Sequence, residues 1–120
     1  MLARSADYPI VRDSAGEQTN PTTTTVMADT GHRALFTGGT GFYEVLCAAS
    51  TTANAQFQLE VRNRANDATV GDAHIFYCPA NQTVAVPFRV LLESEQRLRI
   101  MMNENLTGDA AATVVAQRVA

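Results

Sequence analysis

Apolar and polar residues alternate without interruption from Ala55 to Asn63, in the sequence AQFQLEVRN. Side chains of a β-strand point to opposite faces with a period of two, so this alternation predicts a strand with one face in a core and the other in water. Two further segments, Thr83–Phe88 and Gln96–Met102, alternate in the same way. They predict two more half-buried strands.

Four other segments are rich in strand-forming residues, and polar turns separate them. Phe42–Ala49 is apolar at nearly every position, and such a strand is expected to be central and covered on both faces. Pro87 lacks the backbone N–H that a ladder requires, so its strand should lie at an edge or bend there. The remaining predicted strands are Arg33–Thr37, Val70–Cys78 and Ala112–Val119.

Polar turns recur about every ten residues along most of the chain, and no segment is convincingly helical. This spacing is typical of an all-β fold, an antiparallel sandwich or barrel, and we count about eight strands. The chain has 120 residues, which is the size of a single domain. We therefore predict one β-domain over residues 32–120.

The first 31 residues differ from the rest of the chain. They contain the turn sequence Asp13–Gly16 and a run of four threonines, and the apolar anchors are Tyr8, Ile10 and Val11. A segment with so little apolar area cannot offset the entropy lost when it becomes ordered, unless it docks on something. We therefore predict an extended N-terminal arm over residues 1–31.

The net charge is −3, with nine arginines and no lysine. This balance favours neither nucleic acid nor a membrane surface as a partner. No apolar run approaches the roughly 20 residues that span a bilayer, and the first residues lack the apolar core of a secretory signal. We expect synthesis in the cytosol, where Cys47 and Cys78 would stay free thiols.

No cluster of residues in the sequence indicates a catalytic or metal-binding site. His74 and Cys78 share a strand face but lie about 13 Å apart at roughly 3.3 Å per residue, too far to share one metal ion. Neither histidine lies near a nucleophile elbow. We predict a non-enzymatic protein without metal, cofactor or small-molecule substrate, and a small hydrolase that depends on His74 remains an alternative.

Three arginines, Arg62, Arg97 and Arg99, occupy outward positions of predicted strands. They are either solvated strand exteriors or part of an oligomer interface, where a planar guanidinium can meet acidic groups across the seam. The sequence leaves both interpretations open.

Three parts of the chain carry a resemblance to a known family, namely Gly41–Leu46, Val86–Leu92 with Gln96–Ile100, and Ala112–Val119. Together with the polar arm, this run of strands resembles the capsid decoration, or cement, proteins of tailed bacteriophages over about residues 33–119. The resemblance implies a jelly-roll-like β-sandwich, assembly as a homotrimer, and a place on the outside of the virion. There it would bind the major capsid protein and bridge neighbouring subunits.

If the resemblance holds, the arm extends from the sandwich to the partner and adds a strand to an exposed edge of one of the partner's sheets. The expected anchors are Tyr8, Ile10 and Val11, and the segment with β-propensity is Thr22, Thr23, Thr24, Thr25 and Val26. The alternative function is a carbohydrate- or receptor-binding module of a phage tail or fibre. Against it, the chain has no tryptophan and few loop aromatics that could stack on a sugar.

Overall fold

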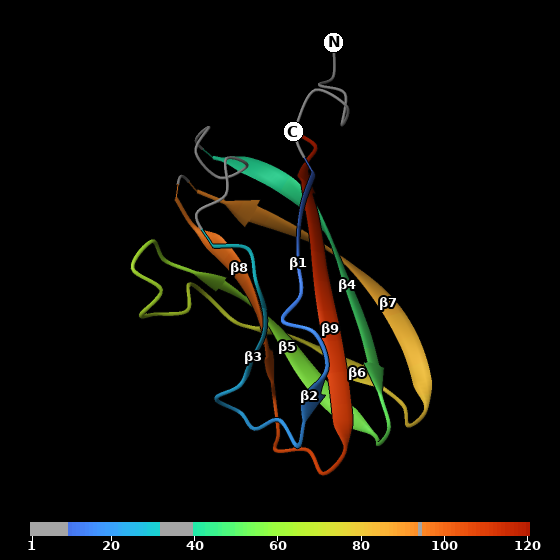
Figure 1. Ribbon diagram of the computed structural model, residues 1–120. Coiled ribbons are helices and arrows are strands. Elements are labelled where there is room, and N and C mark those ends of the chain that lie inside the picture. The colour runs from blue at the N-terminus through green and yellow to red at the C-terminus, as the bar shows by residue number, and fades with distance from the viewer. Residues whose placement is uncertain (1–9, 32–39, 94) are drawn as a thin grey trace.

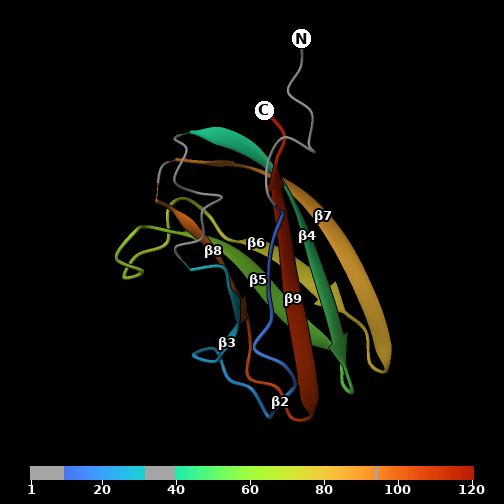
Figure 2. The same cartoon turned by 45° about the horizontal axis from the view of Figure 1, so that its top comes forward.

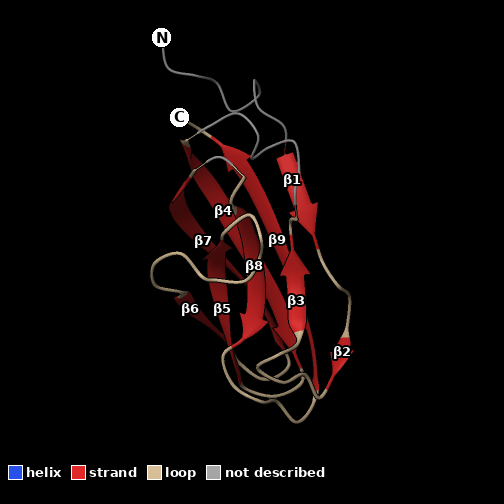
Figure 3. Cartoon of the chain, turned by 90° about the vertical axis from the view of Figure 1, so that its left-hand side faces the viewer, coloured by secondary structure: helices blue, strands red, loops and turns tan. Residues whose placement is uncertain are grey.

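The computed structural model describes residues 10–31, 40–93 and 95–120. The regular structure in this part of the chain is entirely β-strand, and its nine strands form two layers (Figures 1 and 3). The strands are β1 Ile10–Asp13, β2 Gln18–Thr19, β3 Val26–Asp29, β4 Gly41–Thr51, β5 Ala55–Arg62, β6 His74–Cys78, β7 Gln82–Leu92, β8 Arg97–Met102 and β9 Asp109–Arg118.

Both layers are antiparallel sheets. The five-stranded sheet has the order β1-β9-β4-β7, with β2 paired to the other end of β9, and the four-stranded sheet has the order β3-β8-β5-β6. Figure 2 shows β9, β4 and β7 side by side in the first of these sheets. The prediction of an antiparallel, jelly-roll-like β-sandwich is therefore confirmed.

The core lies between the two sheets and follows the alternation read from the sequence. Ala55, Phe57 and Leu59 of β5 are buried, as the period of two predicts. Phe57 stacks on Phe76 of the neighbouring strand β6, with ring centroids 5.3 Å apart. Stacked aromatic rings of this kind add to the stabilisation that apolar burial provides.

Strand β4 is central, as predicted, because it lies between β9 and β7. Its inward residues, Tyr43 and Val45 among them, are almost completely buried, whereas Phe42 and Leu46 on the other face are 47% and 41% exposed. The expectation that both faces of this strand are covered is therefore wrong for the single chain. No layer of the described chain lies over its outer face.

The predicted N-terminal arm is, from residue 10 onward, part of the sandwich. Strand β1 pairs with β9 along the register Ile10↔Gln117, and β3 pairs with β8. Met27 and Ala28 are completely buried, so this segment contributes more apolar area to the core than its polar composition predicts. Residues 1–9, with Tyr8, and the predicted strand Arg33–Thr37 lie outside the described residues.

Hydrogen bonds also join the first strands to each other and to distant loops. The backbone N–H of Asp29 donates to the Asp13 carboxylate over 2.8 Å, which ties β3 to β1 across the two sheets. The backbone N–H of Gly108 donates to the Asn20 side chain over 2.8 Å. These contacts hold residues 10–31 at several separate points.

Strand β7 lies at the edge of its sheet, which confirms the prediction from Pro87. Phe42 exchanges backbone hydrogen bonds with Val119 and Ala120, on the β9 side of β4. Because backbone groups of a strand alternate in direction, Leu46 also faces β9, and its register partner Pro87 therefore faces the free edge. The missing N–H of this proline costs no hydrogen bond within the sheet.

The cysteines Cys47 and Cys78 are buried free thiols. Burial raises the pKa of the Cys47 thiol to about 12, and the Cys78 thiol donates a long hydrogen bond to the Ala49 carbonyl. The thiolate is the form that attacks a disulfide reagent, so we expect neither group to react with dithionitrobenzoate in the folded protein at pH 8, and both to react after denaturation in urea. Rapid labelling of the native protein would contradict this prediction.

Candidate interaction surface

The outer side of the five-stranded sheet is an exposed face with large apolar side chains at its centre and upper end. We call it the open face and define it by the outward residues of β1, β4, β7 and β9. Its largest apolar residues are Ile10, Phe42, Leu46 and Leu91, which are 63%, 47%, 41% and 50% exposed. Several large apolar side chains exposed on one face of a folded chain indicate a candidate site of interaction.

An ion pair crosses the open face between its two longest strands. Glu44 of β4 and Arg89 of β7 are register partners, and the Arg89 Nε donates to the Glu44 carboxylate over 3.0 Å. A terminal nitrogen of the same guanidinium contacts the same oxygen. Both side chains are about half exposed, so this pair contributes at most about 1 kcal/mol to stability.

A shallow hollow of about 270 Å³ lies beside this ion pair. It is lined by Ile10, Glu44, Val45, Leu46, Pro87, Val115 and Gln117. The lining is mostly apolar, so the hollow suits an apolar side chain of a protein partner better than a polar substrate. Ile10, one of the anchors predicted from the sequence, is part of it.

Small side chains make the lower end of the open face nearly flat. Ala48 lies opposite Ala85, and Ser50 lies opposite Thr83. Nothing long projects from these positions, so the backbone of a second sheet can approach at the usual distance of about 10 Å. The open face therefore combines an apolar and charged centre with a flat extension.

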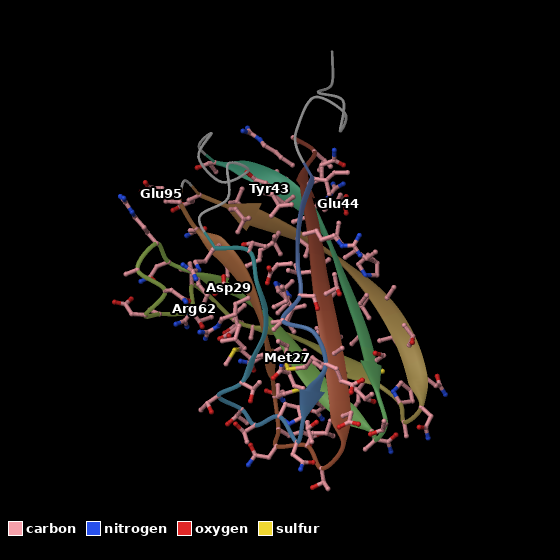
Figure 4. The ribbon with its side chains drawn as sticks, in the orientation of Figure 1. Met27, Asp29, Tyr43, Glu44, Arg62 and Glu95 are labelled. Atoms are coloured by element: carbon pink, nitrogen blue, oxygen red, sulfur yellow. The ribbon has the colours of Figure 1, made fainter. Side chains whose placement is uncertain are left out.

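Two of the predicted interface arginines lie on the opposite side of the molecule, on the outer face of the four-stranded sheet. Arg97 binds the Asp29 carboxylate, with contacts of 3.0 and 2.7 Å, and Arg99 donates to the Glu60 carboxylate over 3.0 Å. Figure 4 shows Asp29 on the side of the molecule away from Glu44. These guanidinium groups meet their acidic partners within the chain.

The third arginine, Arg62, is held by the loop that follows β5. Its Nε donates to the Asn66 side chain over 2.9 Å, and another nitrogen donates to the Thr69 hydroxyl over 2.8 Å. That hydroxyl donates in turn to Glu60, which Arg99 also contacts. The structure thus brings the three arginines together, but their side chains are only 11–15% exposed, and an interface role for them stays a prediction.

The remaining residues of the predicted arm do not form a free strand. Val11 is 8% exposed and packs in the core, so it cannot anchor a partner. The segment Thr22–Thr25 is a turn, closed by a hydrogen bond from the Thr25 N–H to the Thr22 carbonyl. Val26 begins β3. The prediction of a continuous strand over Thr22–Val26 is therefore wrong within this chain, whereas contact of these residues with a partner stays a prediction.

The Thr22–Thr25 segment forms a turn because its side chains make local hydrogen bonds. Threonine hydroxyls bond to nearby backbone groups and so compete with strand formation. In this turn the Thr22 N–H donates to the Thr25 hydroxyl over 3.0 Å, and the Thr23 N–H donates to the Asn105 side chain. These side-chain acceptors take the backbone hydrogen bonds that a strand would make, and this outweighs the β-propensity of threonine.

One feature of the sequence indicates the open face, namely the apolar pattern of Phe42–Ala49. Phe42–Ala49 was predicted to be covered on both faces because both faces are apolar. The chain covers one of them, and the remaining apolar positions, Phe42 and Leu46, are the centre of the open face.

The described parts of the chain contain no cluster that could hold a metal ion. Among residues 10–31, 40–93 and 95–120, no three His, Cys, Asp or Glu side chains lie close enough to hold a metal ion. His74 is exposed and lies against the Phe88 ring, with centroids 5.2 Å apart. The same part of the chain contains no helix that could serve as a membrane span.

Comparison with known proteins places the chain by fold alone. No protein family profile and no curated protein matches the sequence. Among solved structures, xylanase 10B of Clostridium thermocellum, with its CBM22-1 and GH10 modules and bound xylohexaose, superposes on 96% of this chain with a TM-score of 0.62 and 13% identity. This chain spans only 25% of the xylanase chain.

Two structures of similar size to this chain also match. Eiger TNF from S. frugiperda has a TM-score of 0.53 and 11% identity, over 94% of this chain and 93% of its own. The tobacco streak virus coat protein dimer has a TM-score of 0.50 and 15% identity, over 99% and 90%. At these identities the likeness concerns architecture only, and the chain shares the β-sandwich of a viral coat protein, a TNF and a carbohydrate-binding enzyme chain.

Proposed function

We propose that this chain is a non-enzymatic structural protein of a phage virion, which binds the outer surface of the assembled capsid and bridges neighbouring subunits. The observation that carries the proposal is the open face. A central strand that is apolar on both sides, with one side left uncovered, is suited to protein assembly rather than to catalysis. The fold that the chain shares with a viral coat protein is consistent with this class of function.

Binding to an assembled shell stabilises it by linkage. A protein that binds neighbouring subunits of the intact lattice, and not the separated subunits, lowers the free energy of the lattice. Several weak contacts from one oligomer act together through their high effective concentration. Each individual contact with the capsid can therefore be weak. This suits a chain that has only one exposed apolar face among its described residues.

The sheet edges are less suited to such contacts than the faces. Pro87 interrupts the free edge of β7, and the outer strands of the other sheet, β3 and β6, have four and five residues. Short or proline-containing edges resist the addition of a further strand. We therefore assign capsid contact to the β1 and β9 side of the open face and to residues 1–9, for which Tyr8 stays the predicted anchor.

The proposal predicts that the purified chain sediments with expanded capsids of the phage that encodes it, and raises the temperature at which those shells rupture. We expect Tyr8→Ala to weaken binding about 30-fold, because buried tyrosine anchors contribute roughly 2 kcal/mol at interfaces. Tyr77→Ala, at an exposed tyrosine of β6, serves as the matched control and should bind normally. A wild-type chain that stays in the supernatant at saturating concentration would refute the proposal.

One observation favours the second candidate function, carbohydrate binding. Tyr77 is 60% exposed on β6, and its hydroxyl contacts the side-chain amide of Gln56, which also accepts a hydrogen bond from Asn103 over 2.7 Å. An aromatic ring beside amide groups is the chemistry that holds a sugar ring. Glycan-array binding that Tyr77→Ala abolishes would favour this function over capsid attachment.

A further inference from the structure

We propose that the open face binds a second copy of this chain through a two-fold axis that runs parallel to the strands, between β4 and β7. The inference concerns self-association, and it stands independently of the identity of any capsid partner. It rests on the register of these two strands and on the chemical pairing of their outward residues.

The register of β4 and β7 pairs chemically matched residues along the open face. Each outward residue of β4 lies opposite a residue of similar size and polarity on β7, except in one row, where opposite charges meet. The rows are Phe42↔Leu91, Glu44↔Arg89, Leu46↔Pro87, Ala48↔Ala85 and Ser50↔Thr83.

This pairing makes the face complementary to itself. A two-fold rotation about an axis between the strands places β4 of the second copy over β7 of the first, at the same height along the strand. The outward residues near the middle of β4 then lie over their own register partners from the other copy. Apolar residues meet apolar residues, Glu44 meets Arg89 of the second copy, and the same contact recurs by symmetry, as a two-fold interface requires.

The closest contact falls in the middle rows. Two sheets that stack face to face lie about 10 Å apart and cross at about −30°, so their central residues approach most closely. Leu46 and Pro87 are the middle residues of two eleven-residue strands. The interface would therefore have an apolar centre beside two reciprocal ion pairs, which fix its orientation through charge complementarity.

Other two-fold axes parallel to the strands give poorer matches. An axis along β4 itself stacks Glu44 on Glu44 of the second copy, and like charges then oppose each other. An axis between β4 and β9 places Arg89 over Ile10, because Ile10 pairs with Gln117 and Gln117 pairs with Glu44. Of these three arrangements, only the axis between β4 and β7 keeps each charge opposite its complement.

The sequence of β4 supplies a second, independent observation. Its pattern of apolar residues on both faces is typical of a strand with a layer on each side. The four-stranded sheet provides one layer, and a second copy of the same face would provide the other. This contact produces a dimer in place of the homotrimer that the resemblance to decoration proteins implies.

The test is sedimentation velocity of the purified full chain from about 10 to about 200 µM, the range for a small interface. We expect a dimer. Glu44→Arg and Arg89→Glu should each raise the dissociation constant at least about 100-fold, because each variant opposes like charges at both symmetric positions. An equimolar mixture of the two variants should recover a heterodimer, because each then supplies the charge that the other lacks.

A control variant separates the open face from general surface effects. Ile75→Asp, at a β6 residue that is 46% exposed on the other sheet, should leave the dimer intact, whereas Leu46→Asp should abolish it. Circular dichroism checks that each variant is folded. A wild-type monomer over the whole range, a trimer, or single-charge variants that still dimerise would overturn the inference. A monomer that nevertheless binds capsids would overturn it and leave the proposed function standing.

Discussion

A chain that lacks residues 1–31 is expected not to fold. The deletion removes β1, β2 and β3, and with them Val11, Met27, Ala28 and Thr30, which are all buried. Truncation of a buried methionine alone costs about 2–5 kcal/mol, and the entire stability of a domain is about 5–15 kcal/mol. The loss of three strands and the exposure of the core beneath them should exceed this margin. Far-UV circular dichroism and thermal melting should show no cooperative unfolding transition.

The matched control is a chain that lacks only residues 1–9. All nine described strands begin at or after Ile10, so this shorter deletion removes none of their pairings. We expect its melting temperature to stay close to that of the full chain. If the chain without residues 1–31 melted cooperatively at the same temperature as the full chain, the place of β1 and β3 in the two sheets would be wrong.

Replacement of Glu60 by alanine is expected to lower the free energy of unfolding by about 3 kcal/mol. Glu60 is 5% exposed, and its carboxylate is shared by Arg99, Arg62 and the Thr69 hydroxyl. Without it, two largely buried guanidinium groups lose a charged partner, and breaking one side of a buried ion pair costs about 3–5 kcal/mol. We place the effect at the lower end, about 3 kcal/mol, because both arginines retain some exposure. Urea denaturation, followed by circular dichroism, measures the change.

Glu44→Ala provides the comparison, because Glu44 is also paired with an arginine across two neighbouring strands. Its side chain is 46% exposed, and exposed pairs contribute about 0–1 kcal/mol. The experiment should be run at low protein concentration, so that self-association does not add to stability. Equal losses for Glu60→Ala and Glu44→Ala would show that burial does not distinguish the two ion pairs.

The main strands of the sandwich were predictable from the sequence because their signal is local. Ala55–Arg62 alternates without a fault, and the structure buries Ala55, Phe57 and Leu59 as predicted. The face predicted to meet water is only partly exposed, because Glu60 and Arg62 are buried by the ion pairs and hydrogen bonds of the outer face. Strands β1 and β3 have only four residues each, and their stabilisation comes from pairing with β9 and β8, which lie far along the chain. The local composition of residues 1–31 is typical of a mobile arm, and it therefore gives no signal for β1 and β3.

The interaction surface was only partly predictable for a related reason. The two-sided apolar pattern around Phe42 and Leu46 marked the strand, but the match between Glu44 and Arg89 depends on the register of residues 45 positions apart. Arg62, Arg97 and Arg99 were the residues predicted for an interface with another chain. Their outward positions were correct, but their acidic partners, Asp29 and Glu60, belong to the same chain and become neighbours only through the fold.

The proline on the free edge of β7 affects how many copies can join. Where molecules are crowded, as on a shell or in a concentrated solution, unprotected edges would let one sheet continue into the next and grow into fibres. Pro87 interrupts that route at the centre of the longest free edge among the described strands. Pairing of copies through this edge is thereby disfavoured, and in the proposed contact between two open faces a single partner completes the two-fold interface, so growth stops.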